Sequence, residues 1–255
     1  MSVLCANREE SAYTTGRGAG EVDRLLRPGG LELTARAVAS AGLGAGMTVL
    51  DLGCGSGDSV RYLRTLGIDA IGIDFRPNTE KTQDHSLPAC AHVVARAEEL
   101  PFPDCSVDGV MAECSMSLIE DLDSVLAECA RVLKDRGHLI ITDLYARQPD
   151  AIAQVRALKR SCVSGMIVRE ELQAALARHG FTVDLWEDYS QALRESAARF
   201  ILEHGSLEAL WNCDAGAIST EDISSAMRAV RAGYFLLIAT SEQRPIHQKG
   251  PDHER

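Results

Sequence analysis

The sequence predicts an α/β fold in which helices cover both faces of a largely parallel sheet. Short apolar runs alternate with helical patterns along most of the chain, which is typical of successive βαβ units. A glycine-rich turn at residues 53–57 joins the first run to the helical pattern that follows it. The chain has 255 residues, 45% of them hydrophobic and 25% charged, which suits a globular domain with a sizeable core.

The expected elements follow from apolar periodicity and from the residues that end each pattern. A first helix spans 31–41 and is ended by Gly42 and Gly44. Gly137 is expected to end the helix over 120–134. The expected strands span 48–52, 70–74, 91–95, 107–112, 138–144, 181–187 and 234–239, and further helices are expected from 58, over 151–159 and over 169–179.

Four parts are expected along the chain. Residues 1–30 form a polar, glycine-dotted N-terminal arm, and residues 244–255 form a polar tail that we expect to be disordered. The α/β domain comprises residues 31–189 and 232–243, and a helical insert over 190–231 interrupts it. A parallel strand over 181–187 delivers the chain to the carboxyl edge of the sheet. The insert is therefore expected to cover a site at that edge.

The charge and the cysteine pattern argue against several classes of protein. The net charge of -11 disfavours non-specific binding to nucleic acid or to an anionic membrane, because the surface field repels phosphate. No apolar run approaches the ~18 residues of a membrane span, and the first residues lack a signal-peptide core. A cytoplasmic protein is expected. The eight cysteines include no C-x-x-C pair, so no metal site is predicted.

The glycine turn predicts a nucleotide site at the end of the first strand. Gly53, Gly55 and Gly57 allow the backbone to approach a ligand that a Cβ would block, and the following helix directs its unpaired N–H groups there. A dinucleotide fingerprint needs a small residue where Asp58 stands. The carboxylate of Asp58 would repel a pyrophosphate but tolerates a cationic ligand. Asp74, which ends the second strand, suits a ribose diol.

Four motifs in this order resemble those of class I S-adenosylmethionine-dependent methyltransferases, most nearly the ubiquinone/menaquinone C-methyltransferases: Val49–Gly57, Ile73–Phe75, Ala97–Phe102 and Leu133–Gly137. The resemblance covers about residues 45–145. It implies S-adenosylmethionine as the cofactor, and a Rossmann-like sheet of seven strands whose last strand is antiparallel and lies beside the strand over 138–144. The alternative from another class is a non-catalytic nucleotide-binding or NAD-dependent domain.

The resemblance also implies roles for individual residues. Asp51 would lie near the ammonium group of the methionine moiety, Asp74 would accept from the ribose hydroxyls, and Phe75 would pack on the adenine. Arg96 stands where the family usually has an acid that accepts from the adenine amino group, so this contact differs here. The full set of cofactor-binding residues implied is Asp51, Gly53, Cys54, Gly55, Asp74, Phe75, Ala97, Glu98 and Glu113.

Two cysteines are the candidates for binding the methyl acceptor. Cys114 follows the strand over 107–112, and Cys162 precedes the helix over 169–179. Both positions resemble those of arsenite methyltransferases, in which thiolates bind trivalent arsenic, and soft sulfur ligands suit such a metalloid. That family's further cysteines have no counterpart here. The alternatives are a C- or O-methyltransferase of a small organic acceptor such as a quinone, and a buried packing role for each thiol.

Overall fold

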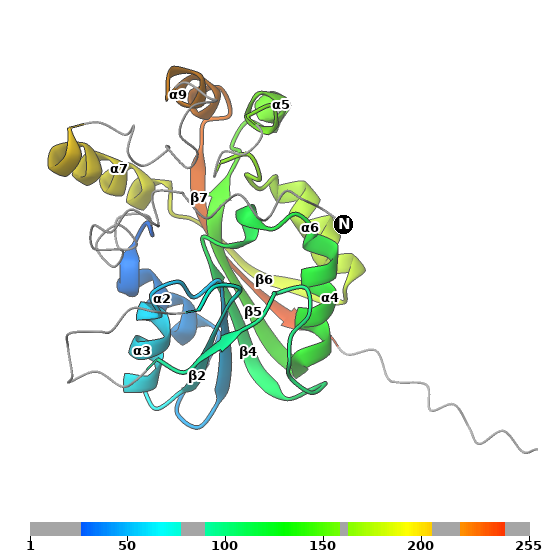
Figure 1. Ribbon diagram of the computed structural model, residues 1–255. Coiled ribbons are helices and arrows are strands. Elements are labelled where there is room, and N and C mark those ends of the chain that lie inside the picture. Colours follow the sequence, from blue (N-terminus) through cyan, green and yellow to red (C-terminus); the bar gives the residue numbers. More distant parts are fainter. Residues whose placement is uncertain (1–26, 78–89, 159–162, 206–219, 243–255) are drawn as a thin grey trace, which may run out of the picture.

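A seven-stranded sheet with helices on both faces forms the body of the protein (Figure 1). The computed structural model describes residues 27–77, 90–158, 163–205 and 220–242. The strand order is β3-β2-β1-β4-β5-β7-β6. Strands β1 to β5 pair in parallel, whereas β7 runs antiparallel to both β5 and β6. The predicted fold class, with the last strand reversed and lying beside β5, is confirmed.

The observed elements agree closely with those expected. The strands are β1 Thr48–Leu52, β2 Asp69–Asp74, β3 His92–Val94, β4 Val107–Glu113, β5 Leu133–Tyr145, β6 Phe181–Asp188 and β7 Gly233–Ser241. The helices are α2 Gly30–Ser40, α3 Asp58–Thr65, α4 Leu122–Val132, α5 Ile152–Arg156, α6 Arg169–Arg178, α7 Ser190–His204 and α9 Thr220–Ala229, and short 3-10 turns, η2 and η3, span Met116–Leu118 and Pro149–Ala151.

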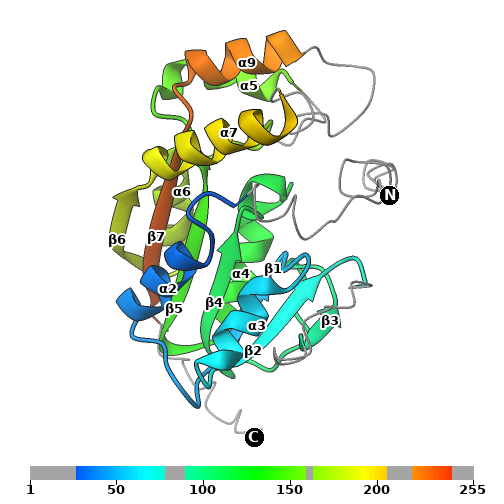
Figure 2. The same cartoon turned by 90° about the vertical axis from the view of Figure 1, so that its left-hand side faces the viewer.

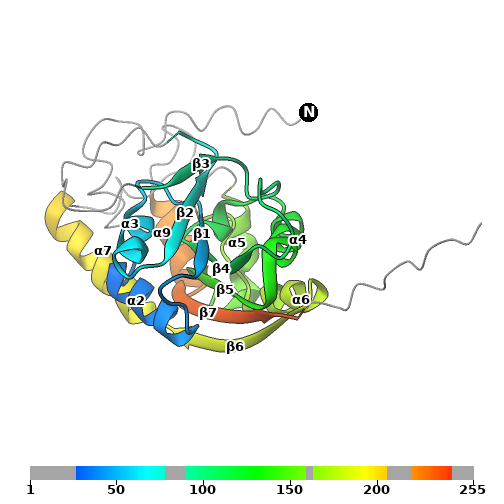
Figure 3. The same ribbon diagram turned by 90° about the horizontal axis from the view of Figure 1, so that it is seen from below.

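The core has one layer on each face of the sheet. Figure 3 shows α4 and α6 on one side and α2, α3 and α7 on the other. Neighbouring residues of β1 enter different layers, because successive side chains of a strand point to opposite faces. Val49 packs with α2 and α3, while Leu50 packs with α4 and α6. Both faces of β1 are therefore buried, and its carboxyl end is left as the place where a ligand can be reached.

The end of α4 differs from the expectation. Gly137 does not end this helix, which stops at Val132, and β5 begins at once with Leu133 in an extended conformation. Leu133 is fully buried and pairs with Val107 of β4. The strand register then jumps, so that the next pair joins Gly109 to His138. Burial of Leu133 in the core ends the helix at Val132, five residues before the glycine.

The region between β6 and β7 contains α7 and α9, and α9 packs against α5 beyond the carboxyl edge of the sheet (Figure 2). This agrees with the helical character expected there, although the proposed division of the chain into four parts stays a prediction. Most of the expected arm, the tail from residue 244 and part of the insert lie outside the described residues. Within the described ranges, no helix is long and apolar enough to cross a membrane.

Candidate cofactor and acceptor site

The glycine turn after β1 is held by the two strands that flank β1. The backbone N–H groups of Gly53 and Cys54 both donate to the carbonyl of Ile73 in β2, at 2.7 and 3.2 Å. Gly53 has a φ of 73°, and a Cβ there would lie 2.6 Å from the Cβ of Ser115, just beyond β4. Ser115 in turn donates to the carbonyl of Leu52 at 2.7 Å. The turn therefore requires glycine for its conformation and for its close approach to Ser115.

Asp74 links the end of β2 to the same turn. Its carboxylate accepts from the backbone N–H of Gly55 at 3.2 Å and from that of Arg76 at 3.0 Å. Only 8% of Asp74 is exposed, whereas 56% of Phe75 is exposed. The guanidinium of Arg76 lies 5.2 Å from the centre of the Phe75 ring and also pairs with Asp74. The end of β2 thus presents an anchored carboxylate beside an exposed aromatic ring.

Two further residues of the β1 motif are buried. Asp51 is 3% exposed and lies between Gly72 of β2 and Met111 of β4 in the sheet register. The thiol of Cys54 packs so closely on Gly72 that a Cβ on that glycine would lie 2.5 Å from the sulfur. Burial raises the pKa of the Cys54 thiol far above its usual range. The side chain of Cys54 therefore acts as a small packing group in this turn.

The residues expected to meet the adenine form a short turn after β3. Arg96 is exposed, and its guanidinium pairs with the carboxylate of Glu98 at 3.1 Å. Ala97 between them is half-buried. The arginine that replaces the family's acid is thus neutralised by a neighbour within the same motif. The predicted roles of Ala97 and Glu98 stay predictions.

Glu113, at the end of β4, makes contacts that sequence reasoning missed. Its carboxylate accepts from Thr34 of α2 at 2.8 Å and from Ser59 of α3 at 2.5 Å, and it pairs with Arg27 at 3.0 Å. Glu113 therefore turns toward the helices that cover one face of the sheet. Its partners lie 54 to 86 residues away in sequence, so no short motif signals them.

Cys114, the first acceptor candidate, has its thiol buried against β7. Its Sγ lies 2.9 Å from the hydroxyl of Tyr234, which donates to Thr142 at 3.0 Å. Burial, reinforced by the nearby charge of Asp143, raises the pKa of the Cys114 thiol well above its usual range. Cys114 also has a φ of 54°, uncommon for a residue with a side chain. The thiol is held neutral in this arrangement.

Cys162, the second candidate, lies outside the described residues, so the predicted pairing of the two thiols stays a prediction. The segment that follows it, residues 163–167, is described. A Cβ on Gly165 would lie 2.0 Å from the carbonyl oxygen of Ser117, in the turn η2 after Cys114. Val163 and Met166 on either side are buried. The chain just beyond Cys162 therefore packs on the loop just beyond Cys114.

Asp143, near the end of β5, is a buried carboxylate that sequence reasoning also missed. It accepts from the backbone N–H of Ser117 at 2.9 Å and from that of Leu144 at 2.7 Å. Burial raises the pKa of Asp143 to about 6 although these donors oppose the shift. An acid at the end of a buried apolar run is the signal that identified Asp74. The same signal was present at Asp143.

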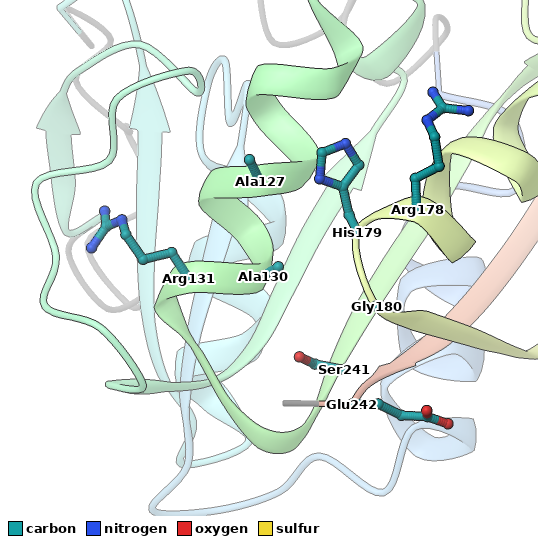
Figure 4. A pocket seen from close by; sticks show the side chains of 8 residues that line it. All are labelled: Ala127, Ala130, Arg131, Arg178, His179, Gly180, Ser241 and Glu242. Atoms are coloured by element: carbon teal, nitrogen blue, oxygen red, sulfur yellow. The ribbon is translucent and has the colours of Figure 1, made fainter. Parts of the chain in front are cut away.

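A groove of about 360 Å³ lies away from this edge (Figure 4). It forms where α4 and α6 end, where β6 begins and where β7 finishes, which is the amino end of the parallel strands. Arg131 pairs there with Glu128 and Asp104, and Arg178 and His179 both pair with Asp123.

Among the described residues, no group of three His, Cys, Asp or Glu side chains is placed to hold a metal ion.

Residues 50–141, which contain the glycine turn, Asp74, Glu113 and Cys114, match the family described as a methyltransferase domain. The match covers 92 of the 255 residues, and this segment is what the chain has in common with methyltransferase domains. The seven-stranded sheet agrees with the fold that the resemblance to class I methyltransferases implied, and the matched segment coincides with the motifs that carry this resemblance. The predicted roles of single residues within the domain stay predictions.

The chain is similar to curated methyltransferases with different acceptors. It is 31% identical over 176 residues to an arsenite methyltransferase of Aquipseudomonas alcaligenes, covering 60% of this chain and 49% of the relative. It is 34% identical over 161 residues to the O-methyltransferase resE of Aspergillus sclerotiorum, covering 59% of this chain and 60% of the relative. The chain thus spans less than two thirds of the length of these relatives.

The fold is also similar to that of the [4+2]-cyclase SpnF, as seen in its crystal structure. The TM-score is 0.63 at 23% sequence identity, and the match covers 84% of this chain and 81% of that one. At this level of identity the likeness concerns the fold alone. The two curated methyltransferases and this cyclase together indicate that the fold of the domain does not fix the chemistry of the acceptor.

Proposed function

We propose that the protein is an enzyme that transfers the methyl group of S-adenosylmethionine to a small acceptor. The observation that carries the proposal is the coupling of Asp74 to the backbone N–H of Gly55 within the glycine turn. It brings a carboxylate that could accept from ribose hydroxyls and the backbone of the glycine turn together at the carboxyl edge of the sheet, where α/β folds bind nucleotides. The cofactor supplies an electrophilic methyl group when bound, and the chain supplies its position.

Each of the predicted cofactor residues would contact one part of S-adenosylmethionine. Asp51 and the turn residues Gly53, Cys54 and Gly55 would hold the methionine end, where buried Asp51 offers a carboxylate to an ammonium group. Asp74 would accept from the ribose hydroxyls, and the exposed ring of Phe75 would pack on the adenine. Ala97 and Glu98 would offer their backbone to the adenine edge. In-line methyl transfer depends on such positioning and on the exclusion of water.

For the acceptor, the first candidate is trivalent arsenic or another thiophile bound by Cys114 and Cys162. The likeness to an arsenite methyltransferase supports it, as does the packing of residues 163–167 on the loop after Cys114. The neutral state of the Cys114 thiol does not oppose it. A thiol S–H and an arsenic-bound hydroxide give an arsenic–sulfur bond and water, so no thiolate needs to exist beforehand. The hydrogen bond of Cys114 to Tyr234 would be broken on binding.

The second candidate is C- or O-methylation of a small organic acceptor, and it rests on Asp143. This carboxylate lies at the same edge, and its pKa of about 6 suits a group that takes up a proton near neutral pH. Its oxygens accept from the backbone of Ser117 and Leu144, so a substrate would have to reach it past η2. The likeness to the O-methyltransferase resE supports this candidate.

Calorimetry and turnover test the proposal in two steps. The wild-type chain is expected to bind S-adenosylhomocysteine and not NAD; tight binding of NAD alone would contradict the methyltransferase proposal. Turnover is then measured as release of S-adenosylhomocysteine with arsenite or with a reduced quinone. Cys114→Ser and Cys162→Ser are expected to abolish turnover on arsenite with cofactor binding intact, and Cys105→Ser, an exposed thiol before β4, is the control. Unchanged arsenite turnover in both variants would favour the organic acceptor.

A further inference from the structure

We propose that Arg27 is a positioning residue for cofactor binding, acting through a buried polar cluster behind the glycine turn. The cluster comprises the carboxylate of Glu113 and its three partners, Arg27, Thr34 and Ser59. The inference rests on the proposed function, since it concerns how the chain prepares the site for S-adenosylmethionine. It also assigns Glu113 a role in shaping the site rather than in touching the cofactor.

The contacts join three segments that are distant in sequence. Arg27 Nη1 donates to Glu113 Oε2 at 3.0 Å and also to the hydroxyl of Ser59. Ser59 Oγ donates to the same carboxylate oxygen at 2.5 Å. Thr34 Oγ1 donates to the other oxygen, Oε1, at 2.8 Å. One carboxylate thereby connects the segment before α2, the helix α2 itself and the first turn of α3.

The cluster is largely removed from water. The side chains of Arg27 and Glu113 are 15% and 4% exposed, and Thr34 and Ser59 are buried. Removal of the cation from such a pair leaves a buried carboxylate without its counter-charge, which is strongly unfavourable. The surrounding segments must then move apart to hydrate Glu113. Truncation of Arg27 therefore acts on the position of α3 as well as on stability.

The cluster is connected to the glycine turn through the start of α3 and through the end of β4. Ser59 is the second residue of α3, whose N-cap is Gly57, the last glycine of the turn. On the other side, Ser115 lies two residues beyond Glu113 and contacts Gly53 at the start of the turn. The end of β4 thus supports the turn at both of its ends. A shift of α3 would misdirect the N–H groups of its first turn, which a helix leaves unpaired for a ligand.

The test is a double-mutant cycle read by calorimetric titration of the full chain with S-adenosylhomocysteine. Arg27→Gln is expected to raise the Kd at least tenfold. Glu113→Gln is expected to raise it less, because Arg27 reaches water more easily than Glu113 does. The double variant, which has no unpaired buried charge, is expected to bind more tightly than Arg27→Gln alone. Arg27→Lys, which keeps the charge, is expected to fall between wild type and Arg27→Gln.

Two control variants separate positioning from loss of stability. Leu176→Ala creates a cavity in α6, on the other face of the sheet, and is expected to lower the Tm without changing the Kd. Arg36→Gln breaks the exposed pair of α2 with Glu187 and is expected to leave both unchanged. If Arg27→Gln does not fold, Arg27→Lys and the double variant supply the same comparison.

The outcomes are distinct. If wild type binds no S-adenosylhomocysteine, the proposed function itself fails. If wild type binds and Arg27→Gln binds within twofold of it, the positioning role of Arg27 is overturned while the proposed function stands. The role is also overturned if the double variant shows the full sum of the two single losses, or if Leu176→Ala weakens binding in proportion to its Tm.

Discussion

At the carboxyl edge of the sheet, the hydrogen bonds of Asp74 join the ends of consecutive strands, whereas the contacts of Cys114 join segments that are distant in sequence. Asp74 bonds to the backbone of Gly55 and Arg76, 19 and 2 residues away. Cys114 contacts Tyr234, 120 residues away, and Gly165 packs on the backbone oxygen of Ser117. The contacts of Asp74 in the cofactor half are therefore encoded within one βαβ unit, whereas the acceptor half depends on the packing of the whole domain.

This difference predicts that the two halves can be damaged separately. A change in the glycine turn should remove cofactor binding, because the backbone itself forms the cradle. A change in the packing of residues 163–167 on the loop after Cys114 should impair turnover and leave the cofactor bound. Two glycines, Gly53 and Gly165, allow the comparison to be made with the same substitution in each half.

Gly53→Ala is expected to have the largest effect. Alanine at a φ of 73° costs roughly 1–2 kcal/mol, and its Cβ would meet the Cβ of Ser115 at 2.6 Å, which forces the turn to move. The Kd for S-adenosylhomocysteine is expected to rise by more than about a hundredfold, or about 2.8 kcal/mol, in calorimetry. Gly44→Ala is the matched control, since a Cβ at Gly44 meets nothing within 4 Å.

Gly165→Ala is expected to impair turnover rather than cofactor binding. Its Cβ would lie 2.0 Å from the backbone oxygen of Ser117, so residues 163–167 must lift from the loop after Cys114. Turnover is expected to fall by about tenfold while the Kd for S-adenosylhomocysteine changes by less than about twofold. An equal loss of cofactor binding in Gly165→Ala and Gly53→Ala would show that the two halves are not separable.

Asp74→Ala is expected to have the next largest effect on the cofactor half. Hydrogen bonds to a charged group contribute about 1.5–3 kcal/mol, so loss of the ribose contact should weaken binding of S-adenosylhomocysteine by roughly ten- to a hundredfold. Asp69→Ala, at the exposed start of the same strand, is the control because the Asp69 side chain is 64% exposed. Equal affinities of Asp74→Ala and Asp69→Ala for S-adenosylhomocysteine would show that Asp74 does not contribute to cofactor binding.

The same contrast explains what the sequence predicted. The glycine turn, Asp51 and Asp74 could be placed at the sheet edge because their positions depend on one strand, one turn and the next strand. The reversed β7 and its place beside β5 followed from the family resemblance. The roles assigned to these residues in cofactor binding are still to be tested by the variants above.

The missed features depend on tertiary packing. Gly137 was expected to end α4 because glycine is a common helix stop, but burial of Leu133 against β4 ended the helix first. The partners of Glu113 and the contact of Cys114 with Tyr234 bring together segments that no spacing pattern relates. Sequence periodicity identifies the face on which a residue lies, but it does not identify the residue that will contact it from another element.

Asp143 offers the most specific test of the acceptor half, because its expected effect is on the pH dependence of stability and not on binding or turnover. Its pKa is raised by burial from 3.8 to about 6 in the folded chain, so the folded state holds more protons than the unfolded state between these values. Stability is therefore expected to fall as pH rises through this window, and above pH 6 ionised Asp143 costs roughly 3 kcal/mol.

Asp143→Asn removes this titration while keeping the shape of the side chain. The free energy of unfolding of wild type minus that of the variant, from urea titrations, is expected to decrease by about 2–3 kcal/mol between pH 4 and pH 7. The contributions of other titrating groups cancel in this difference. A difference that does not vary with pH would mean that Asp143 ionises as an ordinary carboxyl. The organic acceptor would then lose Asp143 as its candidate base.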